Sequence, residues 1–430
     1  MSNWFWIDVF ALMFRTIPLA FLNPFFWIVI YLVISQYRRA ISMEQKLFGQ
    51  AVNNVWEQTF ASLCYGFLGG LFGSFFLVML GISLDSIGIY YILPIAVMLL
   101  LINPRFLCFA YAGGIVALSA LTVRALLPFY PGLEELPLVS GLVDIHIPSM
   151  VALVGILHLT EALLIYISGH RGASPLYLKD SSGKIIGGYS MQRFWPLPLV
   201  GLIGYQAPEM VGSGISMPDW WPLFGSVMAP AAEEQVMYMM VPVVAGLGYS
   251  DIALSNYPHV KRVKTALHLA LYSIVLCTMA VLAVFFSFLI LPAALLAPLG
   301  HEYLVKKGNN SELAADPLFS SGREKGLYIM DIVPQTLAET AGLKRGDRLL
   351  EVNEQDINSE LDFWNLLRLN YQRILLKIDR EGEEIKLPLN LKSQPVNMFG
   401  AIFVPKNGAS AYVEMKQRSL VNRLFKRKQE

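Results

Sequence analysis

The sequence is poor in charged side chains: Asp, Glu, Lys and Arg together make up 15% of its 430 residues, whereas soluble domains contain roughly 25%. Hydrophobic residues make up 55%, so the composition predicts an integral membrane protein and excludes a wholly soluble one. The formal net charge is only +1. Because there is no basic excess to neutralise phosphates, no nucleic-acid partner is expected.

Cysteine is also scarce. The three cysteines, Cys64, Cys108 and Cys277, each lie in an apolar run, and none belongs to a Cys-x-x-Cys pair. This spacing indicates neither a disulfide framework nor a metal site, so we interpret all three as small buried hydrophobic residues. No metal or other cofactor is predicted. The first residues lack a basic stretch and a small-residue cleavage site, so no removable signal peptide is expected.

Long apolar runs fill residues 1–305 and predict a polytopic α-helical membrane domain of about seven or eight spans. The clearest of these runs are 60–82, 87–102, 107–127, 151–167, 266–284 and 286–299. Residues 195–205 and 220–228 are short and rich in Pro and Trp, which is typical of broken helices, and 237–247 is expected to complete a span. The first run carries a face of small residues at which another helix can approach closely: Gly66, Gly69, Gly70 and Gly73.

Charges in the connecting loops predict the orientation. Lys and Arg gather in the loops at about 36–58, 169–193 and 249–264, whereas the connection at 128–148 contains acidic residues and no Lys or Arg. Loops rich in Lys and Arg face the cytoplasm. We therefore expect the cell membrane as the location, with a linker at 306–319 and everything after it on the cytoplasmic side.

The pattern changes at about residue 320, where short alternating strands replace the apolar runs. A strand beginning at Gly326 is stopped by Pro334, a turn containing Gly346 precedes a second strand at 348–353, and Ser359 begins a helix. Two further strands are predicted at 373–379 and 384–391. This order resembles an α+β PDZ domain of the circularly permuted bacterial type, covering 320–392.

The PDZ resemblance implies a groove that captures an extended peptide by adding it as a strand. By analogy, backbone N–H groups of the first strand bind a carboxylate or turn, the rest of that strand lines the peptide, and the helix lies opposite. The residues assigned to these three roles are Gly326, Leu327 and Tyr328; Ile329, Asp331 and Val333; and Leu361, Trp364 and Leu367. The alternative is that the apolar members of this set are simply core.

Residues 393–430 form a C-terminal extension whose last part, 416–428, is basic. Its apolar residues share one helical face, which predicts an amphipathic helix lying on the anionic inner leaflet of the lipid bilayer. The residues expected at the membrane surface are Arg418, Leu420, Leu424, Phe425, Lys426, Arg427 and Lys428. A disordered, solvated tail is the alternative.

Several ionisable groups in the apolar part begin a catalytic pattern, but none completes one. His301-Glu302 opens a zinc-protease motif whose second histidine is replaced by Val305. The other incomplete patterns are His158 with Glu161, Glu233-Glu234 followed by Met239 in place of an arginine, and Gly214-Ile215-Ser216 with His268. We therefore predict a protein that is not an enzyme.

Beyond the PDZ stretch, several segments resemble one family along nearly the whole chain. These segments are Asn23-Pro24 before Tyr37-Arg38-Arg39, 158–164, 174–196, 248–253 and 298–302. They are similar to the MinJ family, polytopic PDZ proteins of Gram-positive rods. The resemblance implies a non-enzymatic adaptor at septum and poles that connects a DivIVA-like scaffold to a MinD-like division inhibitor. The alternative reading is an intramembrane protease gated by its PDZ domain, or a regulatory subunit of one.

Overall fold

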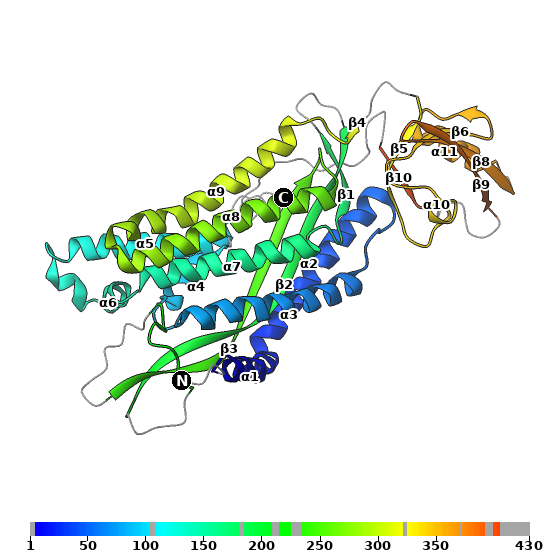
Figure 1. Cartoon of the computed structure of the whole chain (residues 1–430). Helices are drawn as coiled ribbons and strands as arrows, with labels where there is room; N and C mark the ends of the chain where they lie inside the picture. The colour runs from blue at the N-terminus through cyan, green and yellow to red at the C-terminus, as the bar shows by residue number, and fades with distance from the viewer. Residues whose placement is uncertain are drawn as a thin grey trace, which may run out of the picture.

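The computed structural model describes residues 5–103, 106, 108–179, 185–208, 215–224, 234–320, 325–369, 372–391 and 399–404. Within these residues the chain forms a body of long helices crossed by a long β-hairpin, followed by a small α+β domain at one end of the body (Figure 1).

The helices of the body lie in chain order before and after the hairpin. They are α1 (Phe5–Thr16), η1 (Ile17–Leu22), α2 (Pro24–Phe48), α3 (Val55–Leu80), α4 (Ile89–Ile102), α5 (Phe109–Leu126), η3 (Pro131–Glu135), α6 (Pro137–Val143), α7 (Ile147–Ser168), α8 (Pro258–Phe285), η4 (Ser287–Leu289) and α9 (Ile290–Ala314). Local signals set their ends. The Asn54 side chain caps α3 by accepting from the Trp56 N–H at 2.8 Å, and Gly81 ends it in the left-handed conformation.

Six helical segments among the described residues are long and apolar enough to cross a membrane: 5–22, 55–80, 109–126, 147–168, 258–285 and 287–314. Residues 89–102 form a shorter apolar helix. The expectation that the apolar part forms helical segments of spanning length is thus met. The structure differs at 306–319, because α9 continues through most of the predicted linker to Ala314.

The hairpin corrects two predictions. Residues 195–205 were expected to be a broken helix and 237–247 half of a span, but both lie in strands. Strand β1 (Ser174–Lys179) pairs with β2 (Ile185–Pro208), which pairs in turn with β3 (Glu234–Ala253) and with the short β4 (Phe319–Ser320). Pro196, Pro198 and Pro242 would each interrupt a helical hydrogen-bond ladder, and their segments are extended instead.

The small-residue face of α3 allows close approach on two sides, one of them to a strand. A Cβ atom on Gly66 or Gly70 would lie 2.2 Å from the carbonyl oxygen of Pro196 or Pro198 in β2. Gly69 instead faces Leu164 of α7, and Gly73 lies against both Leu199 of β2 and Thr160 of α7. The glycines therefore let α3 pack between a helix and the hairpin, whereas the sequence predicted a helical neighbour only.

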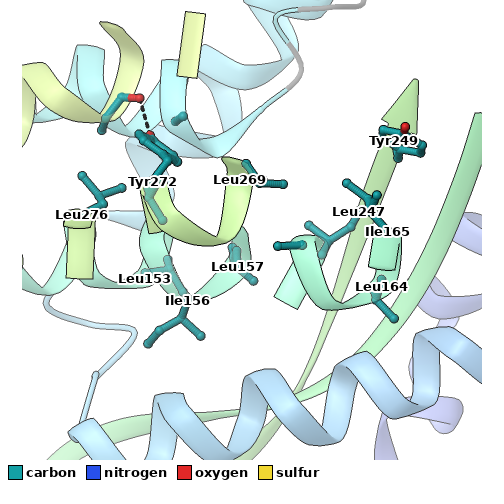
Figure 2. Close-up of a cluster of buried hydrophobic side chains, with 14 of the residues drawn as sticks. Leu153, Ile156, Leu157, Leu164, Ile165, Leu247, Tyr249, Leu269, Tyr272 and Leu276 are labelled. Atoms are coloured by element: carbon teal, nitrogen blue, oxygen red, sulfur yellow. Dashed lines mark hydrogen bonds between the residues drawn. The ribbon is translucent and has the colours of Figure 1, made fainter. Parts of the chain in front are cut away.

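Helix α7 is the centre of the body, since most of its residues are buried. Its Leu153 and Leu157 pack near Leu269 and Leu276 of α8 in one apolar cluster (Figure 2). The Tyr272 hydroxyl donates to the carbonyl oxygen of Ala297 at 2.6 Å, which ties α8 to α9. Close packing of these side chains and the bond from Tyr272 to Ala297 hold α7, α8 and α9 together.

The C-terminal domain contains β5 (Leu327–Ile332), α10 (Leu337–Thr340), β6 (Arg348–Val352), β7 (Gln355–Asp356), α11 (Glu360–Leu367), β8 (Arg373–Arg380), β9 (Glu383–Asn390) and β10 (Ala401–Phe403). Its sheet has the order β10-β5-β6-β8-β9, with β7 beside β6. Ser359 caps α11 in a capping box with Asp362, as its position in the sequence predicted. The sheet extends past the predicted boundary at residue 392, because β10 comes from the stretch assigned to the extension.

Candidate peptide-binding groove

The structure corrects the predicted groove, because β5 is paired on both edges. On one side Leu327 and Tyr328 pair with Leu349 and Arg348 of β6. On the other side Ile332 pairs with Ala401 of β10. A strand that already has two neighbours offers no free edge to a peptide.

The residues assigned to that groove therefore have other roles. Gly326 occupies a positive-φ turn at +94°, and Leu327 and Ile329 are fully buried in the domain core. The Tyr328 carbonyl oxygen accepts from the Val404 N–H at 3.0 Å, and the Val333 N–H donates to the Gly400 oxygen at 2.8 Å. These backbone groups hold β10 and are not available to a carboxylate.

The three helix residues predicted to line the groove differ in their exposure. Leu367 is buried in the core and Leu361 is 67% exposed, so neither lines a half-open surface. Trp364 is partly buried, its ring lies 5.3 Å from that of Phe363, and its indole N–H donates to Glu360 at 3.1 Å. Of the three predicted helix residues, Trp364 has the exposure that a groove residue needs.

Strand β10 forms the end of the sheet and lies beside α11. The Phe363 ring of α11 lies 4.8 Å from the Phe399 ring and 4.9 Å from the Phe403 ring. Ile402 pairs with Asp331, and Gly400 and Val404 also bond to β5. In an antiparallel pair, alternate residues direct their backbone groups to opposite edges, so the N–H and C=O groups of Ala401 and Phe403 point away from β5.

Gly400 immediately precedes this edge strand in a conformation that favours glycine. Its φ is +86°, and a Cβ atom there would lie 2.1 Å from Oγ1 of Thr336. The sequence signal for this strand was present, because Gly400 stands between Phe399 and the β-prone run 401–404. It was missed because the predicted domain ended at residue 392.

One face of the small domain packs against the hairpin of the body. The Tyr189 hydroxyl donates to the Met330 oxygen, and the Tyr177 hydroxyl donates to the outward-facing Phe403 oxygen. Met330 and Val404 belong to the same buried cluster as Tyr189. On the outer edge of β10, the Phe403 carbonyl oxygen therefore already accepts a hydrogen bond from the body.

Asp331, predicted to line a peptide, takes part in this docking. Its Oδ1 accepts from Arg345 at 2.8 Å, and the Arg345 guanidinium lies 4.8 Å from the centre of the Tyr189 ring. Burial raises the pKa of Asp331, although the neighbouring Arg345 opposes that rise. Through Arg345 the pair helps to fix the domain to the body, while the Oδ2 atom of Asp331 is buried without a hydrogen-bond partner among the described residues.

The remaining predicted residues fall into two groups. The membrane-surface residues in 416–428, and Glu233, lie outside the described residues. Glu302 accepts from the Tyr111 hydroxyl at 2.7 Å and forms an ion pair with Lys306 at 3.3 Å. His158 and His301, which belong to different incomplete patterns in the sequence, lie side by side with ring centroids 5.1 Å apart.

The comparisons with known proteins agree with this architecture. Residues 328–380 match the PDZ domain family. The apolar helices and the family match thus define a class: a protein with helices of membrane-spanning length followed by a PDZ domain.

Within that class the chain is similar to one curated division protein over most of its length. It is 27% identical over 377 residues to the cell division topological determinant MinJ of Bacillus subtilis (strain 168), covering 86% of this chain and 89% of that protein. A second match is confined to 88 residues, 34% identical, of a probable periplasmic serine endoprotease DegP-like of Marinomonas sp. (strain MWYL1). That match covers 20% of this chain and 18% of the protease.

Proposed function

We propose that the protein is a non-enzymatic membrane scaffold that positions cell-division proteins. The observation that carries the proposal is the similarity to the division determinant MinJ over 86% of the chain, in both the apolar part and the PDZ domain. By this proposal the partners are a DivIVA-like and a MinD-like protein. The short likeness to a protease covers only 20% of this chain and does not favour the alternative of a PDZ-gated protease.

The arrangement of charges supports a cytoplasmic PDZ domain on a body whose described residues include six helical segments of membrane-spanning length. Lys261 at the start of α8 lies 3.5 Å from Glu312 at the end of α9, and Glu312 also accepts from the backbone of Leu254 at the end of β3. The start of α8, which contains Lys261, Arg262 and Lys264, lies on the side of the body where the PDZ domain is attached (Figure 1). Since basic loops stay in the cytoplasm, this side is inside in our proposal.

We further propose that the peptide groove lies between β10 and α11. A peptide would pair with the outward-facing backbone of Ala401 and Phe403 and would contact Trp364 on the helix. The strand that receives it then comes last in the domain sequence, which is the circularly permuted order. Because the Tyr177 hydroxyl binds the Phe403 oxygen, a bound peptide would have to displace that contact from the body.

Substitution of Trp364 tests the groove. We expect Trp364→Ala to reduce recruitment of the DivIVA-like or the MinD-like protein at least tenfold, because an aromatic anchor beside an added strand contributes about 2 kcal/mol or more. Leu369→Ala, at a side chain 59% exposed just after α11, is the matched control. The measurement is co-purification of each partner with the full chain from detergent-solubilised membranes. Equal recovery of both partners with Trp364→Ala and with the control would place their binding elsewhere.

A further inference from the structure

Three side chains with metal-binding atoms meet inside the helical body, although they are far apart in the sequence. Cys108 precedes α5, His158 lies in the middle of α7 and His301 lies in α9. The Cys108 Sγ atom is 3.2 Å from Nε2 of His158 and 3.8 Å from Nε2 of His301. One ligand atom from each residue lies within 4.8 Å of the other two.

These separations fit a single metal ion bound by all three atoms. Zinc bonds of about 2.3 Å to sulfur and 2.0–2.1 Å to nitrogen, at tetrahedral angles, separate the two ligand atoms by about 3.6 Å. The two sulfur–nitrogen distances in the protein lie on either side of that value. A small adjustment of the side chains would therefore place every ligand at bonding distance.

The orientation of His158 is that of a metal ligand. Its Nδ1 lies 2.7 Å from the carbonyl oxygen of Val154 and can only donate to it. The proton of the neutral ring is thus on Nδ1, which leaves the lone pair of Nε2 directed at Cys108. Metal-binding histidines are held in this way by a hydrogen bond from their second nitrogen.

Hydrogen bonds among these three side chains explain the cluster less well than a bound metal ion does. The Cys108 thiol can donate its proton to one imidazole and accept an N–H from the other, but its 3.8 Å contact with Nε2 of His301 is long even for a hydrogen bond to sulfur. The Nδ1 atom of His301 is buried and has no hydrogen-bond partner among the described residues. Polar side chains buried between apolar helices are costly unless they bind each other or an ion, and aromatic rings of Tyr111 and Tyr272 surround His301.

We propose that Cys108, His158 and His301 bind a transition metal ion of the zinc class and so connect α5, α7 and α9. Thiolate and imidazole are the ligands that Zn²⁺ prefers, and three protein ligands leave a fourth position for water or another small donor. Binding releases the thiol proton of Cys108 to solvent. The ion fastens α9, the helix that leads to the PDZ domain, to the centre of the body.

Cobalt titration of the full chain tests this site. The protein is purified in detergent, stripped with a chelator and titrated with Co²⁺, whose bond to a thiolate gives a charge-transfer band in the near ultraviolet. We expect this band, together with the strong visible bands of tetrahedral cobalt, to saturate at about one ion per chain and to disappear when Zn²⁺ is added. Absence of the bands in the folded wild-type protein would overturn the proposal.

Variants locate the ion. Cys108→Ser is expected to remove the charge-transfer band, and His158→Gln or His301→Gln to weaken Co²⁺ binding at least tenfold. Cys64→Ser and His268→Gln are matched controls, since both residues are exposed on the helical body, and they should bind as the wild type does. If a ligand variant fails to fold, the wild type decides: Zn²⁺ must raise its melting temperature more than Mg²⁺ does. Retention of the band by folded Cys108→Ser, or equal effects of the two ions, would contradict the assignment.

Discussion

At the scale of single residues, contact between α3 and the hairpin depends on glycines. The backbone of β2 lies so close to Gly66 and Gly70 that a single added carbon would overlap a carbonyl oxygen. In tightly packed interiors such overlap is relieved only by moving the backbone or changing side-chain rotamers. These positions therefore determine how closely the hairpin packs on the helix.

We expect Gly70→Ala to destabilise the protein by about 1–3 kcal/mol, the usual cost of overpacking, even though alanine favours a helix by about 1 kcal/mol over glycine. Gly132→Ala is the control, because a Cβ atom there would meet nothing within 4 Å. Thermal unfolding of both variants in the same detergent measures the difference. Equal melting temperatures would show that β2 does not pack on α3 as described.

At the scale of elements, β10 is part of the PDZ core. Phe399 and Phe403 are fully buried with Phe363, and their strand covers the outer edge of β5. An uncovered edge of a sheet is a site for unwanted pairing. Residues 399–404 thus complete the domain, and a domain ending at 392 would lack both a strand and two aromatic core residues.

Phe403→Ala should accordingly lower the stability of the PDZ domain by about 3–5 kcal/mol. Leu361→Ala, at a side chain that is 67% exposed, should change it by less than about 0.5 kcal/mol. Proteolysis of the full chain over a urea series, followed with an antibody against the C-terminal domain, reports the stability of each variant. If Phe403→Ala were as resistant as Leu361→Ala, residues 399–404 would not belong to the core.

Elements that are set by neighbouring residues in the chain could be predicted from the sequence, whereas elements that depend on distant contacts could not. The span at 60–82, the turn around Gly346 and the cap at Ser359 are set by neighbours in the chain, and they were predicted. The strand conformation of 195–205 in β2 and of 237–247 in β3 was not, because their apolar residues fit a buried helix or a buried strand equally well. The pairing of β10 with β5 and the meeting of Cys108 with His301 depend on contacts across the fold, which spacing alone cannot show.

At the scale of the whole molecule, the PDZ domain is attached to the body by more than its chain connection. Tyr177 and Tyr189 of the hairpin hydrogen-bond to backbone atoms of β10 and β5, and Arg345 lies over the Tyr189 ring. A partner that binds β10 therefore acts on a strand already in contact with the body. In the proposed scaffold, a partner that binds at β10 therefore changes the contact between the PDZ domain and the helical body.

The position of a fluorescent fusion in dividing cells tests the proposed division scaffold most directly. Two chains are compared, one complete and one lacking residues 317–430, at equal expression. We predict that the complete chain gathers at septa and poles, and that the truncated chain fails to recruit at least one of the DivIVA-like and MinD-like partners. A uniform membrane signal from the complete chain, with normal septum placement in cells that lack it, would contradict the account.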